Sequence, residues 1–64
     1  MIDYGPLWRT MKEKGISQYY LTKHGIDQKT IYNLKRNRHI RTSTLEKICK
    51  AIGCTPNDVI EFLD

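Results

Sequence analysis

The spacing of three glycines most constrains how this 64-residue chain can fold. Gly15, Gly25 and Gly53 each follow a short segment whose apolar residues recur at helical spacing. Glycine readily takes the left-handed conformation that ends a helix. A good N-cap follows each glycine within two residues, in order Ser17, Asp27 and Thr55. The chain is therefore predicted to be a series of short helices joined by tight turns.

Five helices are predicted in this way. The first follows Gly5-Pro6, since proline loses no needed hydrogen bond at the first helical position. The fourth begins within the segment Ser43-Thr-Leu-Glu46, which fits a capping box. No segment alternates with period two for long enough to be a strand, so we expect an all-α fold in one domain, residues 1–64. The expected helices are Pro6–Lys14, Gln18–His24, one from Gln28 to Arg36 or Asn37, Thr44–Ile52, and one after Thr55-Pro56 with Val59, Ile60, Phe62 and Leu63 on its apolar face.

The third helix differs from the others in its apolar content. Ile31 and Leu34 are its only aliphatic residues, so it is expected to pack along one edge and expose most of its surface. At 100° per residue, the side opposite Ile31 holds polar, basic and aromatic side chains. They are Lys29, Tyr32, Asn33 and Arg36.

The charge of the chain is unevenly distributed. The formal net charge is +4, which favours a polyanionic partner without proving one. Residues 29–41 hold five Lys or Arg and no acid, whereas residues 58–64 hold three of the seven acids and no base. There is no apolar run typical of a signal peptide or a membrane span. We expect a soluble cytoplasmic protein that associates with the nucleoid and contacts no membrane.

The two cysteines have a plain and a functional interpretation. Cys49 and Cys54 are a possible metal pair, but no second pair of Cys or His follows, and a structural zinc site needs four ligands. Free thiols in a reducing cytosol are therefore expected, with no metal and no cofactor. His24 is expected to pack on Tyr20 rather than bind a metal.

The aromatic residues and the remaining motifs also favour a plain interpretation. Trp8 with Tyr4 and Tyr20 suggests base stacking or a ligand cage, but their helical positions favour core packing. The sequence has no Gly-rich phosphate loop and no nucleophile elbow, and five short helices leave little room for a cleft. We therefore expect neither an enzyme nor a small-molecule ligand.

The order and spacing of these segments resemble a known family. Gly15-Ile16-Ser17 with Leu21, Gly25-Ile26-Asp27, Thr30-Ile31 and Leu34, and the run from Thr44 to Asp58 resemble the compact helix-turn-helix regulators of the phage repressor and Cro type, also called the xenobiotic-response-element class. The resemblance covers nearly the whole chain. It departs from the family between Leu21 and Gly25, which are one residue closer than usual, so the aim of the third helix is left open.

The resemblance implies a five-helix lambda-repressor-like fold with the third helix in the DNA major groove. Gln28 and Asn33 suit adenine, and Lys29 and Arg36 suit guanine or phosphate. Thr30 and Tyr32 are candidates for a thymine methyl or a phosphate. The remaining candidates hold phosphates, and they are Gln18, Lys35, Arg38, His39 and Arg41.

Two functions remain open from the sequence. The leading hypothesis is a repressor-like transcriptional regulator of a phage or mobile element, acting by occupancy of double-stranded operator DNA, with a possible homodimer through Phe62 and Leu63. The alternative is a protein-binding module that keeps the fold, such as an antitoxin or an inhibitor of a host protein.

Overall fold

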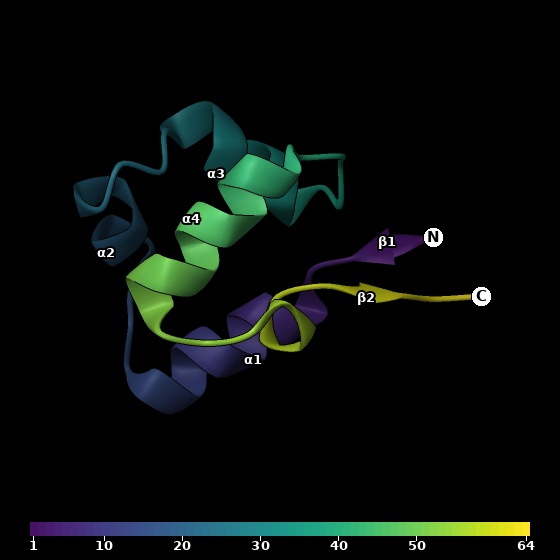
Figure 1. Cartoon of the computed structure of the whole chain (residues 1–64), viewed down its shortest axis with the longest axis horizontal. Coiled ribbons are helices and arrows are strands. Elements are labelled where there is room, and N and C mark those ends of the chain that lie inside the picture. Colours follow the sequence, from purple (N-terminus) through teal and green to yellow (C-terminus); the bar gives the residue numbers. More distant parts are fainter.

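Four α-helices, one 3₁₀ turn and a small antiparallel sheet make up the protein (Figure 1). The computed structural model describes residues 1–64. None of the helices has both the length and the apolar character needed to cross a membrane. In chain order the elements are β1 (Ile2–Asp3), α1 (Gly5–Lys14), α2 (Gln18–Lys23), α3 (Gln28–Lys35), α4 (Thr42–Ile52), η1 (Pro56–Asp58) and β2 (Glu61–Phe62).

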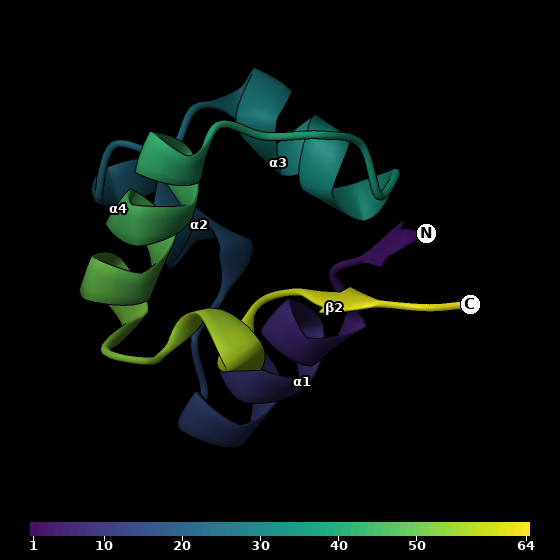
Figure 2. The same cartoon turned by 45° about the vertical axis from the view of Figure 1, so that its right-hand side comes forward.

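The helices surround one apolar core. In Figures 1 and 2, α3 lies at one end of the molecule, α1 lies at the other, and α4 runs between them. Ile31 and Leu34, the predicted apolar stripe of α3, are both buried, as are Ile48 and Ile52 of α4. The whole buried cluster is Tyr4, Leu7, Met11, Leu21, Ile26, Ile31, Leu34, Ile48, Cys49, Ile52 and Val59. The core thus fixes α3 by one edge and leaves its remaining surface free.

The predicted fifth helix is not formed. Thr55 and Asp58 make the reciprocal capping box, but the helical turn ends after three residues. Val59 then enters the core, and Glu61–Phe62 pairs antiparallel with Ile2–Asp3. An isolated helix this short is marginal, because nucleation fixes several residues for one hydrogen bond. The pairing with the N-terminal segment gives the backbone of this segment hydrogen-bond partners in place of those of a helix.

The first residues of the chain therefore form a strand and not a free arm. In the register of the sheet, Ile2 lies opposite Phe62 and Asp3 lies opposite Glu61. Met1 and Leu63 extend the pairing, since each backbone nitrogen donates to the other residue's carbonyl at 2.8 and 2.7 Å. Both termini consequently lie together on one flank of the molecule (Figure 1).

One boundary of each helix differs from the prediction by one or two residues. Helix α1 begins at Gly5 and not at Pro6, and helix α3 ends at Lys35 and not at Arg36 or Asn37. Helix α4 begins at Thr42, with Arg41 as its N-cap, so the predicted capping box at Ser43 is wrong. Ile40 packs against the core, and the first turn closes on the Arg41 carbonyl immediately after it. Helix α2 ends at Lys23, which leaves His24 exposed at the C-cap and not on the inward side. His24 still stacks on Tyr20, with ring centroids 4.2 Å apart.

Candidate nucleic-acid interface

The start of α3 is closed by the predicted cap. The Asp27 carboxylate accepts a hydrogen bond from the Thr30 backbone N–H at 2.8 Å. Hydrogen bonds from Thr30 and the nearby charges of Lys29 and Lys47 lower the pKa of the Asp27 carboxyl. Asp27 is therefore ionised at neutral pH, and its negative charge favours the positive end of the helix dipole.

The backbone groups of the short turn before α3 have hydrogen-bond partners. Gly25 has φ +88°, a conformation that residues with a side chain rarely adopt. The Ile26 N–H donates to the Leu21 carbonyl at 3.0 Å, and the Gly25 N–H donates to the Thr22 carbonyl at 3.1 Å. Lys47 of α4 donates to the Gly25 carbonyl at 3.0 Å. The turn is thus tied to α4 as well as closed within itself.

The end of α3 is tied to the N-terminal segment through Asn37. This residue has φ +55°, which asparagine tolerates better than most residues. Its side-chain oxygen accepts from the Tyr4 N–H at 2.9 Å, and its amide group donates to Asp3 at 3.2 Å. The buried Tyr4 also donates its hydroxyl to the Arg38 carbonyl at 2.6 Å. Residues more than thirty positions away therefore hold the C-terminal end of α3 in place.

One flank of α3 borders a polar hollow. Lys29, Thr30 and Asn33 lie on this side, and Thr30 and Asn33 are half-buried. The loop between α3 and α4 forms the opposite wall, and the hollow measures about 430 Å³. The loop and α4 contribute His39, Ile40, Arg41 and Thr44 to it. Asp27, which caps α3, also lines the hollow. Amide and hydroxyl groups here lie beside two basic side chains and this one carboxylate, an arrangement that suits a hydrogen-bonding partner.

The other flank of α3 carries an aromatic ring and two arginines. The exposed Tyr32 ring has the Arg36 guanidinium carbon 4.9 Å from its centroid and that of Arg38 at 5.6 Å. Both distances fall within the range of cation–π attraction. Lys35 is exposed, and Gln28 is exposed at the start of the helix.

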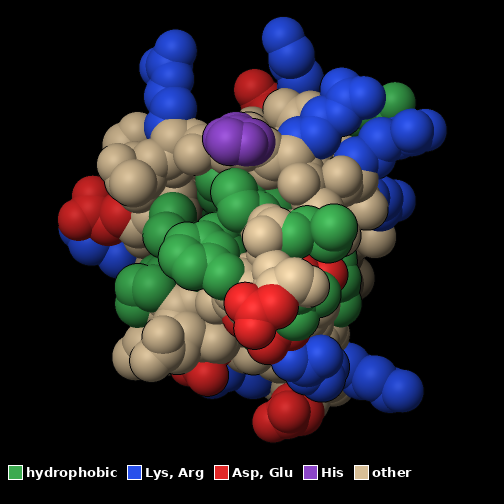
Figure 3. Space-filling view, turned by 90° about the vertical axis from the view of Figure 1, so that its right-hand side faces the viewer, with side chains coloured by type: hydrophobic (Ala, Val, Ile, Leu, Met, Phe, Trp, Pro, Cys, Tyr) green, Lys and Arg blue, Asp and Glu red, His purple; other side chains and the backbone are tan.

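The basic side chains of this region have no acidic partners. The ion pairs of the molecule join Arg9 to Glu61 at 3.7 Å and Lys50 to Glu46 at 3.8 Å. None of the five Lys and Arg of residues 29–41 takes part in one. Figure 3 shows Lys and Arg side chains along the edge of the molecule that Figure 1 gives to α3. Asp27 is the acid beside this surface, so the five Lys and Arg of residues 29–41 leave it with an excess of positive charge.

The predicted site residues thus fall into two clusters, with three residues outside them. The hollow brings together Lys29, Thr30, Asn33 and Arg41, and the Tyr32 ring brings together Arg36 and Arg38. Gln18 lies on another element, as the first residue of α2, where it is exposed and its carbonyl accepts from Thr22 at 3.4 Å. Gln28 and Lys35 lie on α3 outside both clusters.

Sequence reasoning missed three residues that position this surface. Tyr4, Asn37 and Lys47 hold the end of α3 and the turn before it through the hydrogen bonds given above. Asn37 following a helix is a weak signal for a left-handed C-terminal residue. Tyr4 and Lys47 gave no signal, because their partners are distant in the sequence.

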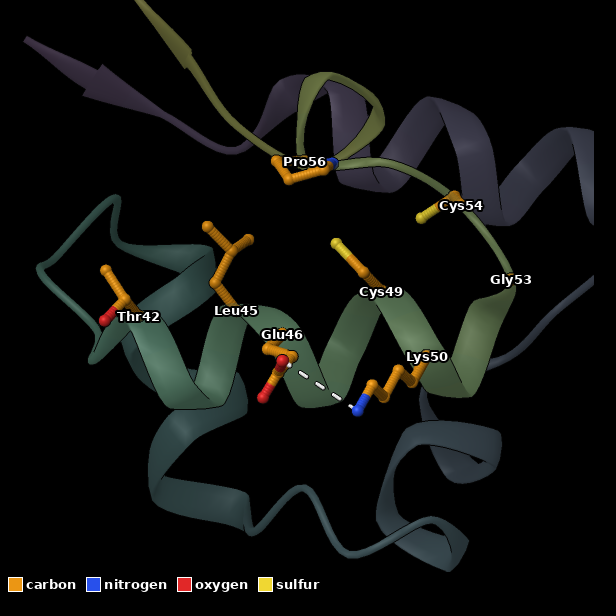
Figure 4. Close-up of a pocket in the computed structure, with 8 residues that line it drawn as sticks. All are labelled: Thr42, Leu45, Glu46, Cys49, Lys50, Gly53, Cys54 and Pro56. Carbon is orange, nitrogen blue, oxygen red and sulfur yellow. Dashed lines mark ion pairs between the residues drawn. The ribbon is translucent and has the colours of Figure 1, made fainter.

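A second, apolar groove lies away from this surface, between α4 and η1 (Figure 4). It measures about 440 Å³, and the side chains of Cys49 and Cys54 point into it from its two sides. Both thiols are free, and burial raises the pKa of Cys49 and that of Cys54, the latter to about 11. No group of three or more His, Cys, Asp or Glu side chains able to hold a metal ion comes together in the structure.

Comparisons with known proteins agree with this geometry. A structure titled "Crystal structure of transcriptional regulator VanUg, Form II" superimposes with a TM-score of 0.89 and 24% sequence identity. The match covers 97% of this chain and 84% of that chain, and it supports the fold. A comparison with curated protein sequences found no match. The family model of the Cro/C1-type HTH DNA-binding domain matches residues 6–64, nearly all of the sequence, and includes the helix pair α2–α3 described above. The chain therefore belongs to the family of Cro/C1-type helix-turn-helix DNA-binding domains.

Proposed function

We propose that the protein is a sequence-specific DNA-binding regulator that places α3 in the major groove of duplex DNA. The observation that carries this proposal is the exposed, unpaired basic surface on and around α3, a helix held firmly at both ends. The phosphate backbone supplies most of the affinity in such complexes, and base edges supply the specificity. The family membership of the chain supports the same function.

The two flanks of α3 suit different parts of the DNA. Lys29 and Asn33, beside the hollow, are the candidates for reading base edges, since Asn pairs with adenine and Lys with guanine. Gln28 and Thr30 lie next to them and would extend the same contact. Tyr32 lies beside two of the basic residues outside this group, Arg36 and Arg38. The residues assigned to phosphates are Gln18, Lys35, Arg36, Arg38 and Arg41.

Duplex binding measured across salt concentration tests the proposal. We expect log affinity to fall linearly with log salt, with a slope of about −0.9 per phosphate contact. The absence of binding to any duplex at low salt would contradict the proposal. Selection of bound sequences from a random duplex pool then gives the recognised half-site and its symmetry.

A pair of variants tests which residues read the bases. Lys29→Ala with Asn33→Ala should reduce preference for the selected site by about 1–3 kcal/mol per lost bidentate contact, with little change in thermal stability. Lys12→Ala removes one positive charge on α1, at the end of the molecule opposite α3, and serves as the control (Figure 1). A double variant that unfolds, or that keeps its site preference, would show that the reading face is misplaced.

We infer that two copies act together on DNA. The flank that carries the termini exposes Phe62 by 79%, Met1 by 85% and Leu63 by 43%. Figure 3 shows apolar side chains across the middle of this flank, below the basic edge. A two-fold axis there would turn both basic surfaces to the same side, as half-sites about 34 Å apart require. Phe62→Ser should weaken binding to a palindromic site far more than binding to one half-site.

The same apolar flank also favours a second candidate function, a protein-binding module such as an antitoxin or inhibitor. Exposed apolar patches mark protein interaction sites as well as dimer interfaces. The salt titration separates the two functions, because a protein-binding module need not bind duplex DNA.

Repression by operator occupancy is the regulatory mode that we propose. A reporter gene carrying the selected site would show whether the protein represses or activates transcription.

A further inference from the structure

Two arginine side chains lie close to the Tyr32 ring. Their guanidinium carbons lie 4.9 Å (Arg36) and 5.6 Å (Arg38) from the ring centroid, and neither arginine forms an ion pair. Two cations at such close range repel each other. The negative faces of the aromatic ring offset part of that repulsion, so the ring allows both charges to occupy one small region.

Arg38 reaches the ring only because the chain reverses at Asn37. Arg36 follows Tyr32 by four residues, so the two are neighbours on any helix. Arg38 follows by six, and a continued helix would rotate it about 240° away from Tyr32. The left-handed Asn37 and the hydrogen bond from the Tyr4 hydroxyl to the Arg38 carbonyl instead hold Arg38 against α3. The triad of Tyr32, Arg36 and Arg38 is thus formed by the tertiary structure.

We propose that Tyr32 is a positioning residue that orients Arg36 and Arg38 in the free protein toward adjacent phosphates of one DNA strand. This inference rests on the proposed DNA-binding function. Arginine side chains have many rotamers, and ordering them on binding opposes affinity. Holding the two guanidinium groups in advance reduces this cost. Tyr32 then contributes to affinity through its ring and not through its hydroxyl or a contact with a base.

The variants Tyr32→Phe and Tyr32→Leu test this role as a matched pair. Phenylalanine keeps the ring, whereas leucine keeps an apolar side chain on the helix but has no aromatic face. Tyr32→Phe should bind duplex DNA within about twofold of the wild type. Tyr32→Leu should bind roughly 5- to 30-fold more weakly, because ordering each of the two arginine side chains on binding then costs about 0.5–1 kcal/mol. Its salt slope should be shallower by about 1–2, since each lost phosphate contact removes about 0.9.

A second measurement examines the free protein. In proton NMR spectra, the side chains of Arg36 and Arg38 should show ring-current shifts in the wild type and in Tyr32→Phe, and should lose them in Tyr32→Leu. Sequence selection with Tyr32→Leu should return the same preferred site, because the two arginines contact phosphates.

Several results would overturn the proposal. The positioning role of Tyr32 would be contradicted if Tyr32→Leu bound DNA as tightly as the wild type. It would also be contradicted if Tyr32→Phe and Tyr32→Leu lost equal affinity, or if Tyr32→Leu changed the preference at one base position. The absence of ring-current shifts in the free wild type would do the same. A wild-type protein that binds no duplex would overturn the proposed function together with this inference, whereas binding with unaltered Tyr32→Leu affinity overturns the inference alone.

Discussion

Replacement of Asn37 should destabilise the whole domain, although the residue is exposed and lies in a loop. Its side chain joins the end of α3 to the first residues of the chain through Tyr4 and Asp3. Its backbone occupies the left-handed region with φ +55°. Asn37→Ala removes both hydrogen bonds and forces alanine into that region, whereas Asn37→Gly removes the bonds alone.

The expected losses follow from these two effects. A donor left without a partner, here the Tyr4 N–H, costs about 1–3 kcal/mol when it is buried. The left-handed conformation costs alanine about 1–2 kcal/mol more. The free energy of unfolding should therefore fall by about 1–3 kcal/mol in Asn37→Gly and by about 2–5 kcal/mol in Asn37→Ala. The free energy of unfolding of a domain of this size is roughly 3–10 kcal/mol in total, so either loss is large.

Thermal and urea unfolding followed by far-UV circular dichroism would measure these losses. Each kcal/mol should lower the Tm by about 4–8 °C in a domain this small. Asn57→Ala is the matched control, because Asn57 is exposed, has negative φ and makes no side-chain hydrogen bond, and its loss should stay within about 0.5 kcal/mol. An Asn37→Gly variant as stable as the wild type would refute the role of the amide bridge. If Asn37→Ala were as stable as Asn37→Gly, the cost assigned to the left-handed conformation would be refuted.

Two further predictions concern pH. The folded state lowers the pKa of Asp27, so the cap contributes stability above the unfolded-state pKa, and this contribution is lost as the pH falls through the folded-state pKa. Asp27→Asn keeps a capping oxygen but does not titrate, so it should flatten the acid limb of a stability–pH curve. An unchanged acid limb in this variant would contradict the assignment. Burial raises the pKa of Cys54 to about 11 from the ordinary 9.0, so stability should fall as the pH rises from 9 to 11. Cys54→Ala should reduce that fall in urea unfolding at fixed pH values, and a fall of the same size in the variant would show that another group causes it.

Much of the helical layout could be predicted from the sequence, because it depends on local interactions. The Asp27 cap, the left-handed Gly15 and Gly53, and the buried stripe of Ile31 and Leu34 are all confirmed. Each depends on residues within a few positions of one another, so its signal lies in a short stretch of sequence. The assignment to the Cro/C1 type is also confirmed. The roles of individual residues in DNA binding remain predictions.

The C-terminal segment shows why local signals are sometimes insufficient. The apolar residues Val59, Ile60 and Phe62 fit one face of a short helix, yet the segment pairs with Ile2–Asp3. The decisive partner lies about sixty residues away, and no local pattern records that the two ends of the chain meet. The start of α4 differs from the prediction for a similar reason, since Ile40 packs against the core just before the helix begins.

The candidate interface was determined at both levels. The sequence alone determined that a polar, basic helix with a narrow apolar stripe begins at Gln28, because 3.6-residue periodicity and capping are local properties. Only the tertiary structure decided how that surface is divided. The loop after α3 forms the wall of one hollow opposite Lys29 and Asn33, while the reversal at Asn37 brings Arg38 to Tyr32. These arrangements depend on Tyr4 and the N-terminal strand, whose contacts with the end of α3 form only when the chain is folded.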